Sequence, residues 1–456
     1  MSIMGFMPRA NLIQNLGFLD CFFSRFGAAA ERFESMQSPA CGAKPRLCAR
    51  DFLALMVWHV ISGSGYLSAH VRELFGMEIK DSSLSERRRR IGMEPFAWLM
   101  KHALRPLADR RVHKSCHYKG LLLCGIDGTK WSVGNTPQIL SKMSKAASRR
   151  LKSAFAKVEM CALVELGLHN PIAAVTGLKG EGEWTLALRL LEALPEKALL
   201  IVDRLYGCGK YLAELAEICR SRRGELLVKA RKSNKSKIIR LLGDGSAMVE
   251  IRLPRRKGEK GVRKMQIREI RGRVRKPGAA KWSEVRLWTT LFDENLHPAE
   301  ELMALYARRW EQEIFYKELK IEMRGGELLR SHTPETAVQE IAALLMACSL
   351  MAGVRAEVAR SGKLEPLRIS FVKTLGRVRS LWMVLSAAEG LIDEESARQL
   401  VGRIMEQILA EATPARRNRS CPRKVRQPVS SWPRLLKNQS NEGDYEVDVV
   451  NMSSIP

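Results

Sequence analysis

The sequence predicts an α/β protein built on a mixed β-sheet. Between residues 118 and 231, three strand-like runs are followed by a helix, a strand, a second helix and a further strand. This order is typical of a sheet covered by helices. Two of the apolar runs, GLLLCGID and ALLIVDRLYG, lead directly into an aspartate, Asp127 or Asp203. Because ligands of such sheets bind beyond the carboxyl ends of strands, we expect both aspartates in a functional site.

The chain is strongly basic. Its 456 residues include 76 Lys or Arg and 49 Asp or Glu, which gives a formal net charge of +27, and 46% of its residues are hydrophobic. Such a charge attracts polyanions, so nucleic acid or an anionic membrane surface is the expected partner. The basic residues are dispersed and form no amphipathic anchor, which favours nucleic acid over a membrane.

The sequence gives no sign of membrane insertion or export. No apolar run reaches the roughly 20 residues of a membrane span, and the longest candidate, residues 341–354, is interrupted and reads as a buried helix. The N-terminus lacks the charged segment and apolar core of a signal peptide. Ten cysteines include no C-x-x-C pair, and the cluster of His113, Cys116 and His117 lacks a second ligand pair for zinc. We therefore expect reduced thiols and a cytoplasmic, nucleoid-associated protein.

The first 117 residues are expected to be helical. Apolar residues recur at helical spacing over residues 49–74, where two glycines should divide the segment into two helices. The next helix is expected to be capped by Ser83, with Glu86 at the matching capping-box position. It carries Arg87–Arg90, four guanidinium groups within about one helical turn. These form either a solvated face or a contact with a DNA backbone.

The sheet and the segments after it follow from apolar runs and their spacing. Its strands are expected over residues 120–127, 157–167, 171–180, 198–207 and 225–231, with helices over 183–194 and 210–222. A basic segment then alternates apolar and polar residues, which predicts short antiparallel strands with Lys and Arg on the open face. Residues 330–409 return to a helical pattern. Between residues 412 and 440 there are eight Lys or Arg and no acid, which indicates a flexible arm or one laid along phosphates.

One further helix is predicted over residues 299–323, which contain no Pro or Gly. At about 100° per residue, Tyr306, Arg309, Glu313 and Lys320 fall on one face, beside an apolar flank suited to a core. An exposed helix held by ion pairs would show the same charges. The aspartates upstream favour a second interpretation, in which Glu313 joins them.

Three carboxylates at one site would repel one another unless a cation neutralised them. Oxygen-only ligands select Mg²⁺ or Mn²⁺. Two such ions, about 4 Å apart, can activate a water or a 3′-hydroxyl for attack on phosphorus and stabilise the leaving oxygen. A single aspartate at a strand end is explained more simply as a turn or helix cap, so the hypothesis depends on Asp127, Asp203 and Glu313 acting together.

These residues also carry a family resemblance. Tyr306, Arg309, Glu313 and Lys320 match the signature Y-x2-R-x3-E-x6-K at every spacing. The chain resembles the DDE transposases of bacterial insertion sequences, in the group of the insertion-sequence-four type. The aspartates in GIDGTKW and IVDRLYG and the strand-prone insertion fit the same pattern, and the resemblance covers about residues 50–350.

The resemblance implies an RNase H-like fold in which Asp127, Asp203 and Glu313 bind two Mg²⁺, or Mn²⁺ in their place. It also implies a domain order along the chain. The expected segments are an N-terminal helical DNA-binding region (1–117), the two parts of the catalytic core (118–231 and 291–350), a basic strand insertion between them (232–290), C-terminal helices (351–411) and a basic tail (412–456).

For the partners, the resemblance implies double-stranded DNA, both the terminal inverted repeats of a transposon and a target, bound by a homodimer in the synaptic complex. Tyr306, Arg309 and Lys320 would contact phosphates near the scissile bond, and Arg204 would approach the same phosphate or pair with a nearby acid. Hydrolysis would nick the transposon end, and the freed 3′-hydroxyl would then attack.

Some members of the family form a hairpin and stack a flipped base on a tryptophan of the insertion. Trp288 and Trp282 lie in the corresponding region, although a place in the core or on the face of the sheet is the simpler explanation of each. Two other functions remain open: a catalytically silent DNA-binding protein derived from a transposase, and a nuclease of the same fold that performs no strand transfer.

Overall fold

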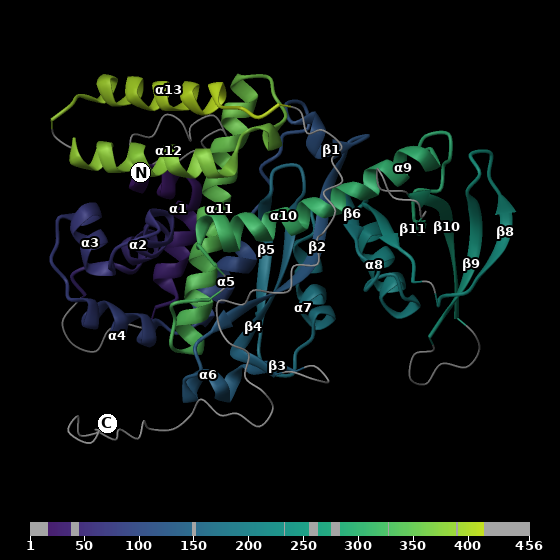
Figure 1. The fold of residues 1–456 in the computed structure, drawn as a ribbon, viewed down its shortest axis with the longest axis horizontal. Helices are drawn as coiled ribbons and strands as arrows, with labels where there is room; N and C mark the ends of the chain where they lie inside the picture. The colour runs from purple at the N-terminus through teal and green to yellow at the C-terminus, as the bar shows by residue number, and fades with distance from the viewer. Residues whose placement is uncertain are drawn as a thin grey trace, which may run out of the picture.

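A mixed β-sheet runs through the centre of the computed structural model, with a block of helices at one end and a group of antiparallel strands at the other (Figure 1). The structure describes residues 17–37, 45–147, 152–231, 233–254, 263–274, 283–326, 328–388 and 391–414. The statements below concern these residues.

Five strands form the core of the sheet in the order β5–β4–β2–β6–β7. They are β2 (Leu121–Val133), β4 (Lys152–Glu165), β5 (Asn170–Gly177), β6 (Ala198–Val202) and β7 (Glu225–Lys229). The first three along the chain pair antiparallel, whereas β6 is parallel to β2 and β7 is parallel to β6. This order with these directions is that of an RNase H-like sheet, which confirms the predicted fold class. Two short strands, β1 (His117–Tyr118) and β3 (Ser144–Ala147), pair with β2 and β4.

Helices cover both faces of this sheet, and alternation along β2 separates the two layers. Leu122, Cys124 and Ile126 share a buried cluster with α7 (Glu183–Leu190) and α8 (Gly209–Ser221). Leu123 points to the opposite face, where it clusters with residues of α9 (Ala299–Tyr306). The strand β6, ALLIV, is buried at every position, as expected for a parallel strand covered on both sides.

The strand β2 is longer than predicted. The apolar run ends at Asp127, but the strand continues to Val133, paired with β4 as far as Ala156. Trp131 and Val133 are fully buried, so core packing and pairing with β4 hold this polar stretch in the sheet. Asp127 therefore lies within a strand, whereas Asp203 directly follows one, as predicted.

The insertion extends the same sheet. Its strands are β8 (Ser236–Leu241), β9 (Ala247–Leu253), β10 (Arg263–Val274) and β11 (Ser283–Thr289). They pair antiparallel in sequence order, and β11 pairs antiparallel with β7. The alternation predicted for β9 is present, with Val249, Ile251 and Leu253 buried. The insertion is thus joined to the catalytic sheet by backbone hydrogen bonds.

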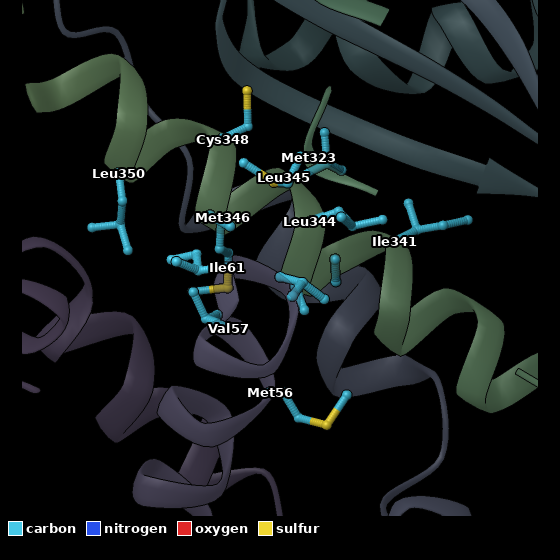
Figure 2. Close-up of a cluster of buried hydrophobic side chains, with 14 of the residues drawn as sticks. Met56, Val57, Ile61, Met323, Ile341, Leu344, Leu345, Met346, Cys348 and Leu350 are labelled. Carbon is cyan, nitrogen blue, oxygen red and sulfur yellow. The ribbon is translucent and has the colours of Figure 1, made fainter. Parts of the chain in front are cut away.

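The helical block combines both ends of the described chain. It contains α1 (Phe18–Ser35), α2 (Ala49–Ser62), α3 (Leu67–Phe75), α4 (Asp81–Ile91), α5 (Glu94–His102), α11 (Pro334–Ser361), α12 (Phe371–Ala387) and α13 (Glu394–Ala410), while α6 (Pro137–Lys142) lies beside the sheet. The predicted division of residues 49–74 occurs at Gly63, which adopts a left-handed conformation with φ of 75°. Figure 2 shows α2 and α11 contributing side chains to one buried cluster, which includes Met56, Ile61, Leu345 and Met346.

The helix α11 confirms the buried helix predicted around residues 341–354. Among the described residues it is the single helix long and apolar enough to cross a membrane by length and composition, and the bent pair α2 and α3 passes the same test only if taken together. The most apolar part of α11 is entirely buried inside the molecule. In this structure it serves as the core of the helical block.

Two expectations about α4 are wrong. The helix begins at Asp81, so Ser83 lies inside it and caps nothing. The cluster of arginines is also divided between two roles. Arg87 donates to a backbone carbonyl of the loop before α2, and Arg88 bonds to α11 through Gln339 and a carbonyl. Because these two guanidinium groups hold helices together, only Arg89 and Arg90 remain exposed for a contact with DNA.

Candidate active site

A long helical segment carries the predicted signature across the sheet (Figure 1). We expected one uninterrupted helix; the structure has α9, a 3₁₀ turn over Ala307–Arg309, α10 (Trp310–Lys317) and a π-helical stretch over Glu318–Met323. The predicted apolar flank does face the core: Phe315, Leu319 and Met323 are buried. Figure 2 shows Met323 beside α11 residues of the same cluster.

The close approach of α10 to β2 depends on a glycine. A Cβ atom at Gly125 would lie 2.7 Å from Oε1 of Gln312, so a larger residue there would force the side chain of Gln312 to move. Gln312 also donates to the carbonyl of Ala162 at 3.2 Å, and Tyr316 donates to the carbonyl of Asp127 at 2.5 Å. These contacts fix α10 directly over Asp127.

The two aspartates lie side by side. In the parallel pair, Gly125 is opposite Ile201, and two residues further along each strand are Asp127 and Asp203. Neighbouring strands are about 4.8 Å apart. Asp127 accepts a hydrogen bond from the amide of Gly128 at 2.8 Å, and Asp203 accepts one from the amide of Leu205 at 2.6 Å. Since β6 ends at Val202 while β2 continues, the carboxylates occupy the gap left beside β2.

Arg309 links Glu313 to this pair. Its Nη2 is 2.8 Å from Oε1 of Glu313, and its Nη1 is 3.7 Å from Oδ2 of Asp127. Arg309 thus links two of the three predicted carboxylates, Asp127 and Glu313, while the strand register places Asp203 beside Asp127. The guanidinium lies between the first and third acids, where it neutralises part of their charge.

The site holds more negative charge than its surroundings compensate. The pKa of Asp127 is raised from 3.8 to about 7 by burial first, and then by the charges of Glu183 and Asp203. The amide of Gly128 and the guanidinium of Arg309 lower it only in part. A carboxyl group that binds a proton near neutral pH marks a place where a cation would be favoured.

The donor set fits a divalent metal in its chemistry. Asp127, Asp203 and Glu313 supply only carboxylate oxygens, the ligands that Mg²⁺ and Mn²⁺ prefer, and the charge of Asp203 adds to the burial and the charge of Glu183 that raise the pKa of Asp127. Within the described ranges, no group of three or more His, Cys, Asp or Glu side chains is arranged closely enough to hold one ion. The contact of Arg309 with both Asp127 and Glu313 accounts for part of this separation.

Tyr306 lies against the same site from α9. Its hydroxyl donates to the carbonyl of Val202, the residue before Asp203, at 3.3 Å. Burial raises the pKa of Tyr306, Arg309 lowers it, and Asp203 and Asp127 raise it further. The phenol is therefore a neutral hydrogen-bonding group at the edge of the carboxylates.

Lys320 is placed differently from the prediction. Its ammonium donates to the backbone carbonyl of Lys130 at 2.7 Å and lies 5.4 Å from the ring centroid of Trp131. The residue is buried, with 7% of its surface exposed. In this structure its charge holds the helical segment to β2, and the contact with a DNA phosphate stays a prediction.

Trp288 is also a core residue. It is 1% exposed in the cluster beneath α7 and α8, and its indole nitrogen donates to Glu269 at 2.8 Å. Its burial supports the interpretation as a core residue, and stacking of a DNA base on Trp288 stays a prediction that this DNA-free structure does not test. Trp282 lies outside the described residues.

Arg204 borders a basic pocket that opens beside Asp203. The pocket has a volume of about 1100 Å³ and lies between the core sheet and the insertion. Arg204 itself is exposed, as a group that meets an outside ligand should be. Among the described lining residues, six are basic and two acidic: Arg204, Lys229, Arg231, Arg271, Arg273 and Arg286, with Asp203 and Glu284.

Sequence reasoning missed one acidic residue at this site. Glu183, the first residue of α7, accepts a hydrogen bond from the hydroxyl of Tyr206 at 2.9 Å and raises the pKa of Asp127. An acid in the first turn of a helix is common because it favours the helix dipole, so nothing in the local pattern singled out Glu183.

Comparison with known proteins gives consistent results. A family model described as "Transposase DDE domain" matches residues 120–350. The transposase InsG for insertion sequence element IS4 of Escherichia coli (strain K12) is 27% identical over 368 residues, which cover 80% of each chain. The putative transposase InsZ of the same organism is 27% identical over 126 residues, which cover 27% of this chain and 42% of that protein.

A solved structure, the cryo-EM structure of the piggyBac transposase synaptic complex with hairpin DNA, aligns with a TM-score of 0.40 and 10% identity. The alignment covers 92% of this chain and 89% of the other.

Proposed function

Because this chain belongs to the transposase DDE-domain family, whose model spans residues 120–350, we propose that it cuts DNA at the ends of a mobile element and joins them to a target. The observation that supports the proposal is the arrangement of carboxylates around Asp127 at the end of β6. Two aspartates occupy neighbouring positions on parallel strands, and Arg309 links the glutamate to the first of them.

In this proposal Asp127, Asp203 and Glu313 hold two Mg²⁺ ions, for which Mn²⁺ can substitute. When bound, the ions activate the attacking oxygen and stabilise the leaving oxygen on phosphorus. The protein contributes a rigid support: β2 and β6 fix the aspartates by their register, and α10 is held over them by Tyr316 and Gln312.

Arg309 and Tyr306 then act on the DNA. A guanidinium can bind a phosphate through two parallel hydrogen bonds, and Arg309 already lies between Asp127 and Glu313. With those carboxylates bound to metal, Arg309 would be available to the scissile phosphate. The hydroxyl of Tyr306, beside Val202, is suited to a neighbouring phosphate oxygen.

The basic pocket supplies a path for the strand beyond the cut. Arg204 follows Asp203 directly, and the other cations line the way toward β10 and β11. Phosphate contacts of this kind give affinity without sequence readout and weaken steeply with salt. We assign recognition of the inverted repeats to the N-terminal helices, where Arg89 and Arg90 are exposed, and pairing of two ends to a homodimer in the cytoplasm.

The test uses a labelled duplex that carries the terminal inverted repeat of the element, with Mg²⁺ or with EDTA. Nicking at the end is expected only with metal. Replacing a residue that only supports a metal ligand typically lowers activity about 10- to 100-fold. We expect a larger loss from each of Asp127→Ala, Asp203→Asn and Glu313→Gln, because each removes a proposed ligand itself. The matched control is Glu300→Gln, an exposed glutamate of α9, which should keep full activity.

The outcomes separate the alternative functions. Salt-sensitive binding without cleavage under any metal would assign the chain to silent DNA-binding derivatives of transposases. Nicking without strand transfer, from a duplex supplied with a pre-cleaved 3′-hydroxyl end, would assign it to nucleases of this fold. Cleavage that persists in Glu313→Gln would refute the assignment of that residue.

A further inference from the structure

A second, smaller pocket lies in the helical block and shares no lining residue with the basic pocket beside Asp203. Its volume is about 40 Å³. A water needs about 10 to 15 Å³, so the space holds roughly three waters or the oxygens of one phosphate group. We call it the arginine pocket. Its described lining residues are Met56, His59, Val60, Gly63, Arg88, Met323, Arg324, Arg330 and Glu340.

One acid faces three arginines in the arginine pocket. Glu340 is buried, and its Oε1 accepts a hydrogen bond from Nε of Arg324 at 2.8 Å. Its Oε2 accepts one from the hydroxyl of Ser331 at 2.7 Å. Both carboxylate oxygens are therefore engaged, and the lining keeps a surplus of two positive charges. Like charges gathered around one cavity repel one another, and an anion in the cavity would relieve this repulsion.

Two polar groups of this lining have no partner in the part of the chain that the structure describes. The guanidinium of Arg330, an exposed residue, makes no hydrogen bond or ion pair with another described residue. Nδ1 of His59 is buried and has no hydrogen-bond partner there either. Leaving a buried nitrogen unpaired is unfavourable, so a ligand that accepts a hydrogen bond from it would stabilise the folded protein.

The electrostatics agree with this geometry. The pKa of His59 is lowered from 6.5 to about 3, by burial first and then by the charges of His70, Arg88, Arg330 and Arg324. The imidazole is therefore neutral near pH 7. A neutral imidazole that carries its proton on Nδ1 is a hydrogen-bond donor, as an anion in the pocket requires.

We propose that the arginine pocket binds one phosphate group of the DNA backbone, with the guanidinium of Arg330 and Nδ1 of His59 as donors. Arg88 and Arg324, which are engaged in other hydrogen bonds, contribute charge. The inference rests on the DNA binding of the proposed function but not on cleavage.

The pocket lies close enough to the carboxylates for one duplex to touch both. Arg324 follows the helical segment that carries Glu313. At about 1.5 Å per helical residue, the two positions are about 16 Å apart along this segment. One turn of duplex DNA is longer, at about 34 Å.

The first measurement is the binding of a labelled DNA duplex to the full-length protein in EDTA, over a range of salt concentrations. Arg330→Gln should weaken binding severalfold at low salt and reduce the slope of log affinity against log salt by about 0.9, the value for one phosphate contact. Arg330→Lys keeps the charge but loses the planar fork, so it should recover the slope and only part of the affinity. The matched control is Arg403→Gln, an exposed arginine of α13 without a described partner, which should change neither.

The second measurement uses inorganic phosphate alone. A ligand that binds only the folded protein raises its melting temperature, so the unaltered protein should melt higher in phosphate than in chloride at equal ionic strength. Arg330→Gln and His59→Phe should each lose part of this difference, and Arg403→Gln should keep it.

The outcomes separate the inference from the proposed function. If Arg330→Gln keeps the affinity, the salt slope and the phosphate effect, the inference is overturned. A phosphate effect lost in Arg330→Gln with an unchanged DNA slope would refute the DNA backbone as the ligand and assign the pocket to free phosphate. If the unaltered protein cuts no DNA, the proposed function fails, whereas both binding measurements still decide the inference.

Discussion

Replacing Asp127 by asparagine should stabilise the metal-free protein above neutral pH. The folded protein raises the pKa of this carboxyl from 3.8 to about 7, so its ionisation opposes folding. A shift of about 3 pKa units at 1.36 kcal/mol each amounts to about 4 kcal/mol. Because 24% of the side chain is exposed to solvent, we expect a measured gain of about 2 to 4 kcal/mol.

The sign of the pH dependence follows from the proton balance. Below pH 3.8 the carboxyl is protonated in both the folded and unfolded states, and the variant gains nothing. Between pH 3.8 and about 7 the unfolded chain releases its proton first, so the stability of the unaltered protein falls relative to Asp127→Asn. Above pH 7 both states are ionised, and the full difference is present.

The assay is urea-induced unfolding in EDTA at several pH values, with Asp293→Asn as the control. Asp293 is an exposed carboxylate whose pKa is lowered by the amides of Leu296 and Asn295, so its replacement should not stabilise the protein. The reasoning is refuted if Asp127→Asn is no more stable than the unaltered protein at pH 8, or if its advantage is the same at pH 4 as at pH 8.

Three further predictions concern residues around the site. Trp288→Ala should cost about 3 to 5 kcal/mol of stability and leave the DNA affinity of the folded fraction unchanged; lost affinity with a normal thermal melt would restore a DNA-stacking role. His169 lies 2.8 and 2.9 Å from Glu318 and Glu311; burial lowers its pKa, but the two glutamates raise it overall above 6.5. The stabilisation that protonated His169 gives the folded protein is fully present below pH 6.5 and is lost as the pH rises through its folded pKa. His169→Gln should therefore flatten the decline of melting temperature above pH 6.5, and an unchanged slope would contradict this. Arg309→Met should tighten Mn²⁺ binding and weaken salt-dependent DNA binding; weaker Mn²⁺ binding would show that Arg309 does not compete for the carboxylates.

The acidic residues of the site could be predicted because local patterns determine them. Asp127 and Asp203 follow apolar runs that form neighbouring parallel strands, and the helical period places Glu313 with Arg309 on one face. The position of Glu183 could not be predicted, since it depends on the absence of a side chain at Gly128, distant in the sequence.

The positions where the structure differs from the sequence-based expectations share one physical cause, since each depends on a partner distant in the sequence. Lys320 matched a DNA-contacting signature, but the backbone of β2 supplies its hydrogen-bond acceptor. Arg88 belongs to a charged run, but its guanidinium donates a hydrogen bond to Gln339, a buried residue of α11. The strand was expected to end at Asp127, and only pairing with β4 shows that it continues to Val133.

The pairing of β11 with β7 has a consequence for where DNA is cut. Trp288 is opposite Val228, and β7 is in turn paired with β6, which ends beside Asp203. In the proposed function, a DNA strand bound by the insertion would therefore be held at a fixed distance from Asp203, because backbone hydrogen bonds through β7 and β6 connect the insertion to that residue.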